Sequence, residues 1–136
     1  MMGTREAAKL NEWLEKVGGR AQVGTFAQAA AHGELIFNAT NGAGALEALG
    51  LAGEANLNGK ILIDISNPLD FSKGMPPSLL VCNTDSLGEQ IQRAFPNVKV
   101  VKSLNTLTAN LMVNPHLLAQ AEHTIFVSGN DAGAKA

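Results

Sequence analysis

The chain has little cysteine and few aromatic residues, and each scarcity excludes a class of protein. Its 136 residues include one cysteine, Cys82, which rules out an internal disulfide framework and a zinc site built from several thiolates. Five phenylalanines, one tryptophan and no tyrosine are too few for a platform that stacks the bases of single-stranded nucleic acid. The apolar runs are far shorter than the ~18 residues of a membrane-spanning helix.

An excess of charge of one sign is also missing. Ten Lys and Arg against twelve Asp and Glu give a net charge of -2, so nucleic acid and anionic membranes are poor candidate partners. The first ten residues have no apolar core typical of a secretory signal. Hydrophobic residues make up 46% of the chain and charged residues 16%, which predicts one globular domain over residues 1–136. We expect this domain to be cytoplasmic.

Short apolar runs separated by helical patterns predict an α/β fold. The runs show little alternation, which is typical of strands covered on both faces. They are Leu35–Phe37, Ile61–Ile65, Val98–Val101 and Thr124–Val127, with a weaker candidate at Gln22–Gly24. Their spacing leaves room for a helix between successive strands, which predicts βαβ units and a doubly wound parallel sheet.

Helix boundaries can be predicted from capping patterns. Leu10–Val17 has helical spacing and is closed by Gly18 and Gly19. Thr25–Gln28 and Ser86–Glu89 each have the form of a capping box at the start of a helix. Asn114 followed by a proline predicts a further short helix.

Small or hydrogen-bonding residues follow every predicted strand. Ligands of open parallel sheets bind beyond the carboxyl ends of the strands, where helix N-termini offer free N–H groups to phosphate or carboxylate. The alternative interpretation is that these residues only cap helices and form turns. The four segments are Asn38–Gly44, Ser66–Pro68, Asn105–Thr106 and Ser128–Asn130.

Four motifs also occur in a characteristic order: Met1–Arg5, Asn38–Thr40, Asp64–Leu69 and Ser103–Thr106. In this order and spacing the whole chain resembles the NADP oxidoreductases related to the deazaflavin (coenzyme F420)-dependent NADP reductases. The resemblance implies a Rossmann-like fold, NADP as cofactor, and hydride transfer between NADP(H) and a deazaflavin or similar small-molecule acceptor.

The sequence departs from that family in its phosphate-binding turn. Family members begin with a strand, a glycine-rich turn and a helix, and no such pattern is found here. Gly42 and Gly44 provide G-x-G, but the third glycine is missing and the motif follows a later strand. Family members also continue beyond Ala136. We therefore expect an incomplete Rossmann-like sheet, without the first strand and the glycine-rich loop, from the middle of a longer enzyme.

The resemblance assigns cofactor-binding roles to residues at three strand ends. The adenosine end would use a hydroxyl and a guanidinium on the 2′-phosphate, because arginine binds phosphate in a bidentate manner. The other two ends would line the pyrophosphate and ribose path and the nicotinamide wall. Thr4 and Arg5 would form the adenosine end. Ala39, Thr40 and Asn41 would line the pyrophosphate and ribose path, and Ser66, Asn67 and Pro68 would form the nicotinamide wall.

The same resemblance places the second substrate beside the nicotinamide. Leu69 could pack against a flat ring, and Asn105 and Thr106 could reach the acceptor. No residue has to act as a general acid or base, because in hydride transfer the cofactors carry the chemistry. The three histidines share no ligand spacing, so no metal site is expected.

Two single residues stand out from their surroundings. Asp64 lies within an apolar strand, where an unpaired carboxylate is costly, and we expect it to accept hydrogen bonds in a structural role. Cys82 is expected to be a small buried hydrophobe.

Three alternatives stay open from sequence. The chain is a segment of an oxidoreductase, a non-catalytic module that senses NADP(H), or a fragment stable only with a partner segment. Without the phosphate-binding turn we expect weak NADP(H) binding at best. Loss of a central first strand would leave an exposed parallel edge, so we expect a homodimer that covers it or a rearranged Met1–Gly24 region.

Overall fold

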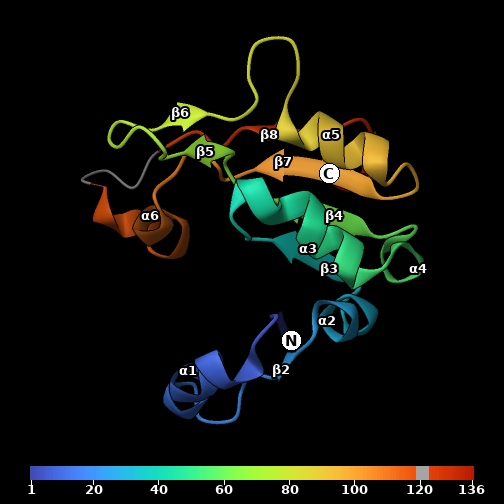
Figure 1. Ribbon diagram of the computed structural model, residues 1–136, viewed down its shortest axis with the longest axis vertical. Helices are drawn as coiled ribbons and strands as arrows, with labels where there is room; N and C mark the ends of the chain where they lie inside the picture. The colour runs from blue at the N-terminus through green and yellow to red at the C-terminus, as the bar shows by residue number, and fades with distance from the viewer. Residues whose placement is uncertain (119–122) are drawn as a thin grey trace.

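The computed structural model describes residues 1–118 and 123–136 and confirms the mixed α/β fold (Figure 1). The main sheet has the order β3-β4-β7-β8, and its strands are β3 (Leu35–Asn38), β4 (Ile61–Asp64), β7 (Lys99–Ser103) and β8 (Val127–Ser128). β3, β4 and β7 are parallel, and their register places Asn38 opposite Asp64 and Asp64 opposite Lys102. Three polar side chains thereby meet across neighbouring strands.

Strand β8 differs from the sequence-based predictions in its direction and in the exposure of its residues. β8 runs antiparallel to β7, with Ser128 opposite Lys102, so its carboxyl end points away from the edge where the other strands end. Ile125, Phe126 and Val127 are exposed, although the sequence predicted a strand covered on both faces. Leu35 and Phe37 in β3 are exposed as well. The prediction of coverage on both faces is therefore wrong for the two edge strands.

The core lies between the main sheet and the helices that pack on it. These helices are α3 (Ala45–Ala52), α4 (Glu54–Leu57) and α5 (Leu87–Ala94). Ser86 caps α5 by accepting a hydrogen bond from the N–H of Glu89 at 3.2 Å, which confirms the cap. The reciprocal bond of a capping box is not formed, because the N–H of Ser86 donates to Oδ1 of Asp85. Leu57, Leu62 and Ile91 are almost completely buried in this core. Their packing fixes the strand ends that follow β4 and β7.

The N-terminal part forms a separate small sheet. β1 (Met2–Gly3) pairs in parallel with β2 (Val23–Gly24), and between them lie the 3-10 helix η1 (Ala7–Leu10) and α1 (Asn11–Lys16). α2 (Phe26–His32) packs against both β1 and α3 and so joins this sheet to the rest of the chain (Figure 1). The capping box of α2 at Thr25 and Gln28 is confirmed. Gly18 and Gly19 have φ of +60° and +75°, which is the left-handed turn expected after α1.

Several short elements were not predicted. β5 (Leu69–Asp70) and β6 (Ser78–Leu79) form an antiparallel hairpin, and α6 (Ala109–Val113) and α7 (Ala132–Lys135) are single short helices. The 3-10 helix η2 (Gly42–Gly44) precedes α3. The helix expected after Asn114 is only the 3-10 turn η3 (Pro115–Leu117), and the Asn114 side chain does not cap it.

No helix in the described ranges is long and apolar enough to cross a membrane.

Candidate functional site

The carboxyl ends of β3, β4 and β7 are tied together by a buried polar network. The Asp64 side chain is fully buried, and its Oδ1 accepts hydrogen bonds from Nδ2 of Asn38 at 2.9 Å and Oγ of Ser66 at 2.6 Å. Its Oδ2 lies 2.8 Å from Nζ of Lys102. The hydroxyl of Thr40 extends the chain by donating to Oδ1 of Asn38 at 2.8 Å. The structural role expected for Asp64 is therefore confirmed, and the network fixes this edge of the sheet.

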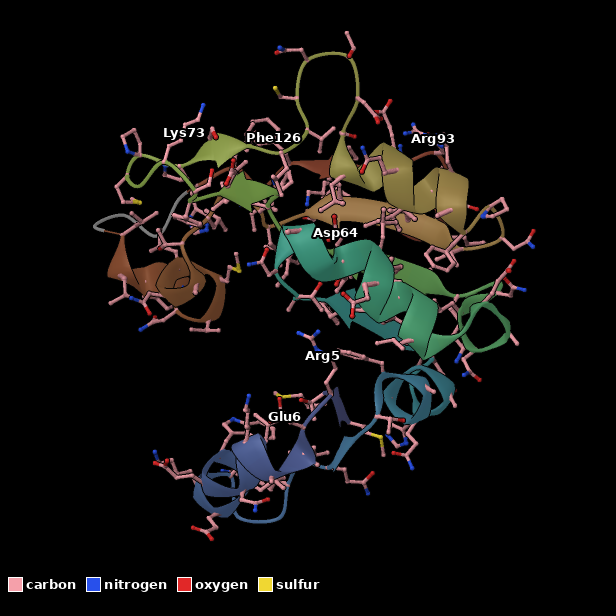
Figure 2. The ribbon with its side chains drawn as sticks, viewed as in Figure 1. Arg5, Glu6, Asp64, Lys73, Arg93 and Phe126 are labelled. Carbon is pink, nitrogen blue, oxygen red and sulfur yellow. The ribbon has the colours of Figure 1, made fainter. Side chains whose placement is uncertain are left out.

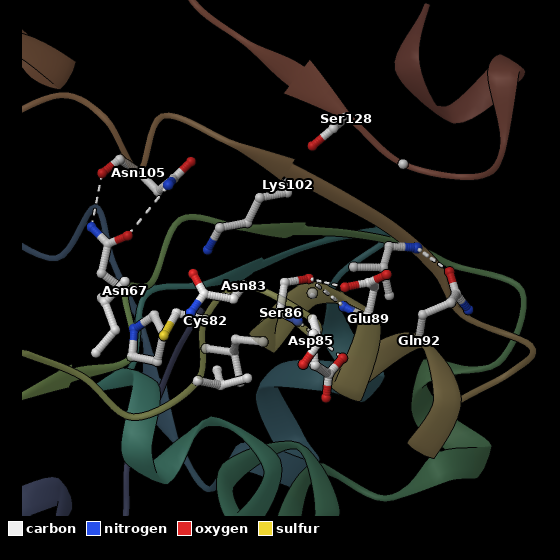
Figure 3. A pocket seen from close by; sticks show the side chains of 18 of the residues that line it. Asn67, Cys82, Asn83, Asp85, Ser86, Glu89, Gln92, Lys102, Asn105 and Ser128 are labelled. Carbon is white, nitrogen blue, oxygen red and sulfur yellow. Dashed lines mark hydrogen bonds between the residues drawn. The ribbon is translucent and has the colours of Figure 1, made fainter.

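A cavity of about 830 Å³ opens beside this network, and we call it the rim cavity (Figure 3). Its walls come from the turn after β4, the segment 79–89, strand β7 and the residues after β8. Lys102 reaches toward its middle, and the side chains of Asn83 and Ser86 line the side opposite β7. Its volume falls within the ~300–1,000 Å³ usual for small-molecule sites.

Two amides form one end of the rim cavity. Nδ2 of Asn67 donates to the main-chain oxygen of Asn105 at 2.8 Å, and Nδ2 of Asn105 donates to Oδ1 of Asn67 at 3.3 Å (Figure 3). The pair joins the segments after β4 and β7 and holds both amide planes in place. Such fixed donors and acceptors are suited to orienting a carboxamide or a heterocyclic ring edge.

The turn that carries Asn67 is also fixed by a close contact with a glycine. A Cβ atom on Gly42 would lie 2.3 Å from the main-chain oxygen of Asn67 and 2.7 Å from Cα of Pro68. Only glycine allows η2 to approach the turn so closely. The segments after β3 and β4 are therefore in direct contact at the rim.

An ion pair holds Asp85, one of the residues that line the rim cavity. Both guanidinium NH groups of Arg93 donate to the Asp85 carboxylate, at 3.0 and 2.7 Å. These hydrogen bonds from Arg93, with a further one from Gln90, lower the pKa of Asp85 to about 2. The same pairing raises the pKa of Arg93. Asp85 is thus a carboxylate at neutral pH, and it anchors the segment before α5.

A second, smaller cavity is lined by residues that follow β1 and β3 and by residues of α3. Arg5, Thr40 and Asn41 line this cavity of about 110 Å³ (Figure 2 labels Arg5). Nη1 of Arg5 lies 3.4 Å from Oε1 of Glu47, and the two side chains are 71% and 65% exposed. In the part of the chain that the structure describes, this long contact is the one side-chain hydrogen bond of Arg5, so Arg5 can bind an anion without losing a strong partner.

The predicted cofactor and substrate residues fall into two groups. The structure brings most of them to the edge formed by the strand ends, but four of them, Thr4 among them, line none of the cavities described. Ser66 is buried against Asp64, Leu69 pairs with Leu79 in the β5–β6 hairpin, and Thr106 is exposed outside the cavities described. The residues that line a cavity are Arg5, Ala39, Thr40, Asn41, Asn67, Pro68 and Asn105.

Sequence reasoning missed Lys102 and placed Cys82 wrongly. Lys102 follows the apolar stretch of β7 and is in register with Asp64, so a lysine one strand away from a buried aspartate was the available signal. Cys82 is exposed and lines the rim cavity, contrary to the expectation that it is buried. Burial was inferred from three apolar neighbours in sequence, but the segment around it is a loop.

The residues at the adenosine end suit NADP better than those along the pyrophosphate path. Among the described residues the Arg5 guanidinium makes one long contact, with Glu47, and the hydroxyl of Thr4 accepts a hydrogen bond from the N–H of Glu6 at 3.1 Å. Oδ1 of Asn41, by contrast, accepts from the N–H of Ala43 at 3.0 Å and serves as a helix cap. Gly42–Gly44 forms a helical turn packed against the main chain of Asn67. Within residues 1–118 and 123–136 no group of three or more His, Cys, Asp or Glu is placed to hold a metal ion.

Comparison with known proteins agrees with this geometry. The family model described as NADP oxidoreductase, coenzyme F420-dependent, matches residues 1–68, which is half of the chain. No curated protein matches. A crystal structure of a proposed F420-dependent NADP reductase from Arthrobacter sp. FB24 is 55% identical and superposes with a TM-score of 0.93 over 98% of this chain.

A second crystal structure, of the hypothetical protein SMa0349 from Sinorhizobium meliloti, is 23% identical with a TM-score of 0.75 over 96% of this chain and shares the fold. The chain spans 63% of the Arthrobacter protein and 61% of the Sinorhizobium protein. The superposition on the Arthrobacter structure covers 98% of this chain and therefore nearly all of Met1–Gly24, so the rearrangement of this region considered from sequence is not observed. The chain has a Rossmann-like fold and belongs to the coenzyme F420-dependent NADP oxidoreductase family.

Proposed function

We propose that the protein binds NADP(H) along the edge formed by the carboxyl ends of β1, β3 and β4, and that hydride passes to a deazaflavin or flavin in the rim cavity. Arg5 would hold the 2′-phosphate, and the nicotinamide would lie toward Asn67 and Asn105. The supporting observation is that these three residues, from strands far apart in sequence, lie along the same edge of the fold. The family supports the same cofactor.

When bound, NADPH supplies the hydride, and the residues of the chain position the two rings. The reciprocal hydrogen bonds of Asn67 and Asn105 fix two amides at the nicotinamide side of the cavity. Pro68 directs the chain around the turn, and its main-chain oxygen accepts from the N–H of Leu80 at 2.8 Å, which attaches the cavity wall to this turn. Lys102, held by Asp64, brings a positive charge to the acceptor side of the cavity.

The full product of the gene provides the test of activity. We expect it to oxidise NADPH with a deazaflavin acceptor, and more slowly with a flavin, under steady-state conditions. Tight NADPH binding with no turnover on either acceptor would favour the sensing module and would contradict hydride transfer. An Asn67→Ala variant should lower kcat more than it changes the Kd for NADPH, because Asn67 contacts the ring end and not the phosphates.

Binding by the 136-residue chain is a separate expectation. In dinucleotide-binding folds, main-chain N–H groups of a glycine-rich turn and a helix N-terminus bind the pyrophosphate. Because Gly42–Gly44 packs against Asn67 and cannot serve as that turn, the chain should bind NADPH weakly. Titration calorimetry with NADPH checks this, and a micromolar or tighter Kd would contradict it.

A further inference from the structure

Three tight turns of the main chain contribute residues to the walls of the rim cavity. In each turn an N–H group donates to the main-chain oxygen two residues earlier, which defines a γ-turn. Outside the helices and strands of the described ranges, such bonds join Leu69 to Asn67 at 2.9 Å, Thr84 to Cys82 at 2.9 Å and Asn105 to Ser103 at 2.8 Å. Because each turn includes at least one residue that lines the rim cavity, the tightest turns of the fold gather at this site.

The central residues of the three turns differ in conformational cost. Pro68 has a fixed negative φ, which suits the common inverse form of the γ-turn. Within the described ranges, Asn83 and Leu104 are the only residues other than glycine with positive φ, at +65° and +61°. Asparagine adopts positive φ several times more often than most residues, whereas a bulky side chain at positive φ is an outlier. The strain is therefore concentrated at Leu104.

The residues on either side of Leu104 are held from different directions. Ser103 is the last residue of β7, and its hydroxyl donates to the main-chain oxygen of Phe126 at 3.0 Å. Asn105 is held by the reciprocal hydrogen bonds with Asn67 (Figure 3). One residue must therefore turn the chain from the end of β7 to the amide pair. Strained conformations of this kind persist where the surrounding structure fixes both sides, and they cluster at functional sites.

The side chain of Leu104 does not contribute to the site directly. It is half-buried and lines none of the cavities described. The main-chain oxygen of Leu104 accepts from the N–H of Leu107 at 3.0 Å, in the turn that follows. An effect of Leu104 on a ligand in the rim cavity must therefore act through its backbone and through Asn105.

We propose that Leu104 is a positioning residue for the hydride transfer proposed above, because its strained γ-turn aims the Asn105 amide at Asn67. The turn holds the N–H of Asn105, and the amide pair holds its main-chain oxygen and its side chain. Relaxation of Leu104 displaces all three groups together. The effect on turnover rests on the proposed function, whereas the effect on the amide pair does not.

The alternative is that Leu104 only packs its apolar side chain. Three substitutions separate the two roles, because they rank differently in shape and in backbone preference. Asparagine accepts positive φ but is polar, and isoleucine is apolar but is β-branched and resists positive φ. Glycine accepts positive φ without being restricted to it. A backbone role favours asparagine over isoleucine, and a packing role favours isoleucine over asparagine.

Steady-state kinetics of the full gene product with NADPH and a deazaflavin acceptor measure the effect on turnover. We expect Leu104→Asn to keep kcat within about twofold of the wild type. Leu104→Gly should lower kcat about fivefold, because the turn is no longer fixed. Leu104→Ile should lower kcat about tenfold or more, since displaced positioning groups cost rate. The Kd for NADPH should change less than about threefold in all three variants, because the phosphates lie elsewhere.

Hydrogen exchange of the side-chain amide protons of Asn67 and Asn105, read by NMR in the full gene product, measures the amide pair without turnover. These protons should exchange about tenfold faster in Leu104→Ile than in the wild type and remain slow in Leu104→Asn. If Leu104→Ile does not fold, the comparison of Leu104→Asn with Leu104→Gly carries the test. Leu104→Gly should then show the faster exchange and the lower kcat of the two.

Leu46 provides the matched control, because it is a partly exposed leucine of α3 that lines none of the cavities described. Leu46→Asn and Leu46→Ile should each leave kcat and the exchange of both amides within about twofold of the wild type. The proposal is overturned if Leu104→Ile keeps at least the kcat of Leu104→Asn, or if no Leu104 variant changes the exchange of the two amides. A wild type without turnover on any acceptor contradicts the proposed function, and the exchange rates alone then decide whether Leu104 positions the amide pair.

Discussion

Nζ of Lys102 lies 2.8 Å from Oδ2 of Asp64, across two neighbouring parallel strands and at the base of the rim cavity. The Asp64 side chain is fully buried, and that of Lys102 is 22% exposed. Lys102 also donates to the main-chain oxygen of Ser66. One lysine therefore neutralises a buried carboxylate and fixes the first residue of the turn that carries Asn67.

Lys102→Met should destabilise the protein by about 3 kcal/mol, because a buried carboxylate that loses its partner costs about 3–5 kcal/mol and Asp64 keeps its bonds from Asn38 and Ser66. Chemical denaturation measures the change. Lys99→Met, on the same strand with a half-exposed side chain 3.3 Å from Asp131, is the control and should cost less than about 1 kcal/mol. Equal losses in the two variants would contradict the role given to Lys102.

Gly42→Ala should destabilise the protein by about 1–3 kcal/mol, since the new Cβ would overlap the main-chain oxygen of Asn67 and force η2 away from the turn. Gly44→Ala, two residues later, has no neighbour within 4 Å and should change stability by less than about 1 kcal/mol. Thermal unfolding of the two variants compares them. A Gly42→Ala protein as stable as Gly44→Ala would show that the close contact is absent.

The Asp85–Arg93 pair predicts a pH-dependent contribution to stability. The pKa of Asp85 falls from 3.8 to about 2 on folding, so the unfolded chain binds more protons between these values. The stabilisation is complete above about pH 4 and disappears as the pH falls to about 2. The melting temperature of Asp85→Asn should therefore lie below that of the wild type at pH 6 and approach it near pH 2.

Arg93→Gln should reduce the same pH dependence, because the hydrogen bonds from Arg93 are the main cause of the lowered pKa. A difference between the wild type and Asp85→Asn that is constant from pH 6 to pH 2 would mean that the ion pair does not stabilise the fold.

Much of the fold could be predicted because it depends on local patterns. The apolar strands β3, β4 and β7 and the caps at Thr25 and Ser86 follow from periodicity and capping chemistry, both of which act within a few residues. The direction of β8 could not be predicted, because strand polarity depends on how the preceding connection crosses the sheet. The β5–β6 hairpin has strands of two residues, too short for any periodic signal.

Site residues that directly follow a strand could be predicted from sequence. Site residues whose role depends on the register between neighbouring strands could not. Asn67 and Asn105 follow strands directly, so the topology brings them together. Lys102 was missed because its role depends on lying opposite Asp64, which requires the alignment of β4 and β7. Cys82 was placed wrongly because the loop that carries it has apolar residues that line a cavity instead of entering the core.

Arg5→Ala should raise the Kd for NADPH of the full gene product by about one to two orders of magnitude, because charge-assisted hydrogen bonds to a phosphate contribute roughly 1.5–3 kcal/mol. The Kd for NADH, which has no 2′-phosphate, should hardly change. Lys9→Ala, an exposed lysine of η1 paired with Glu6, is the control and should leave both values unchanged. An equal loss for the two nucleotides would remove Arg5 from the 2′-phosphate site.

Transfer of deuterium from the nicotinamide ring of labelled NADPH, catalysed by the full gene product, tests most directly whether this edge of the sheet supports hydride transfer. The reaction is run with a deazaflavin acceptor, and the label in the products is measured by mass spectrometry. The proposed function predicts one deuterium in the reduced acceptor for each NADP⁺ formed, and a strongly reduced yield in Arg5→Ala. Bound NADPH that keeps its deuterium in the presence of every deazaflavin and flavin acceptor would contradict it.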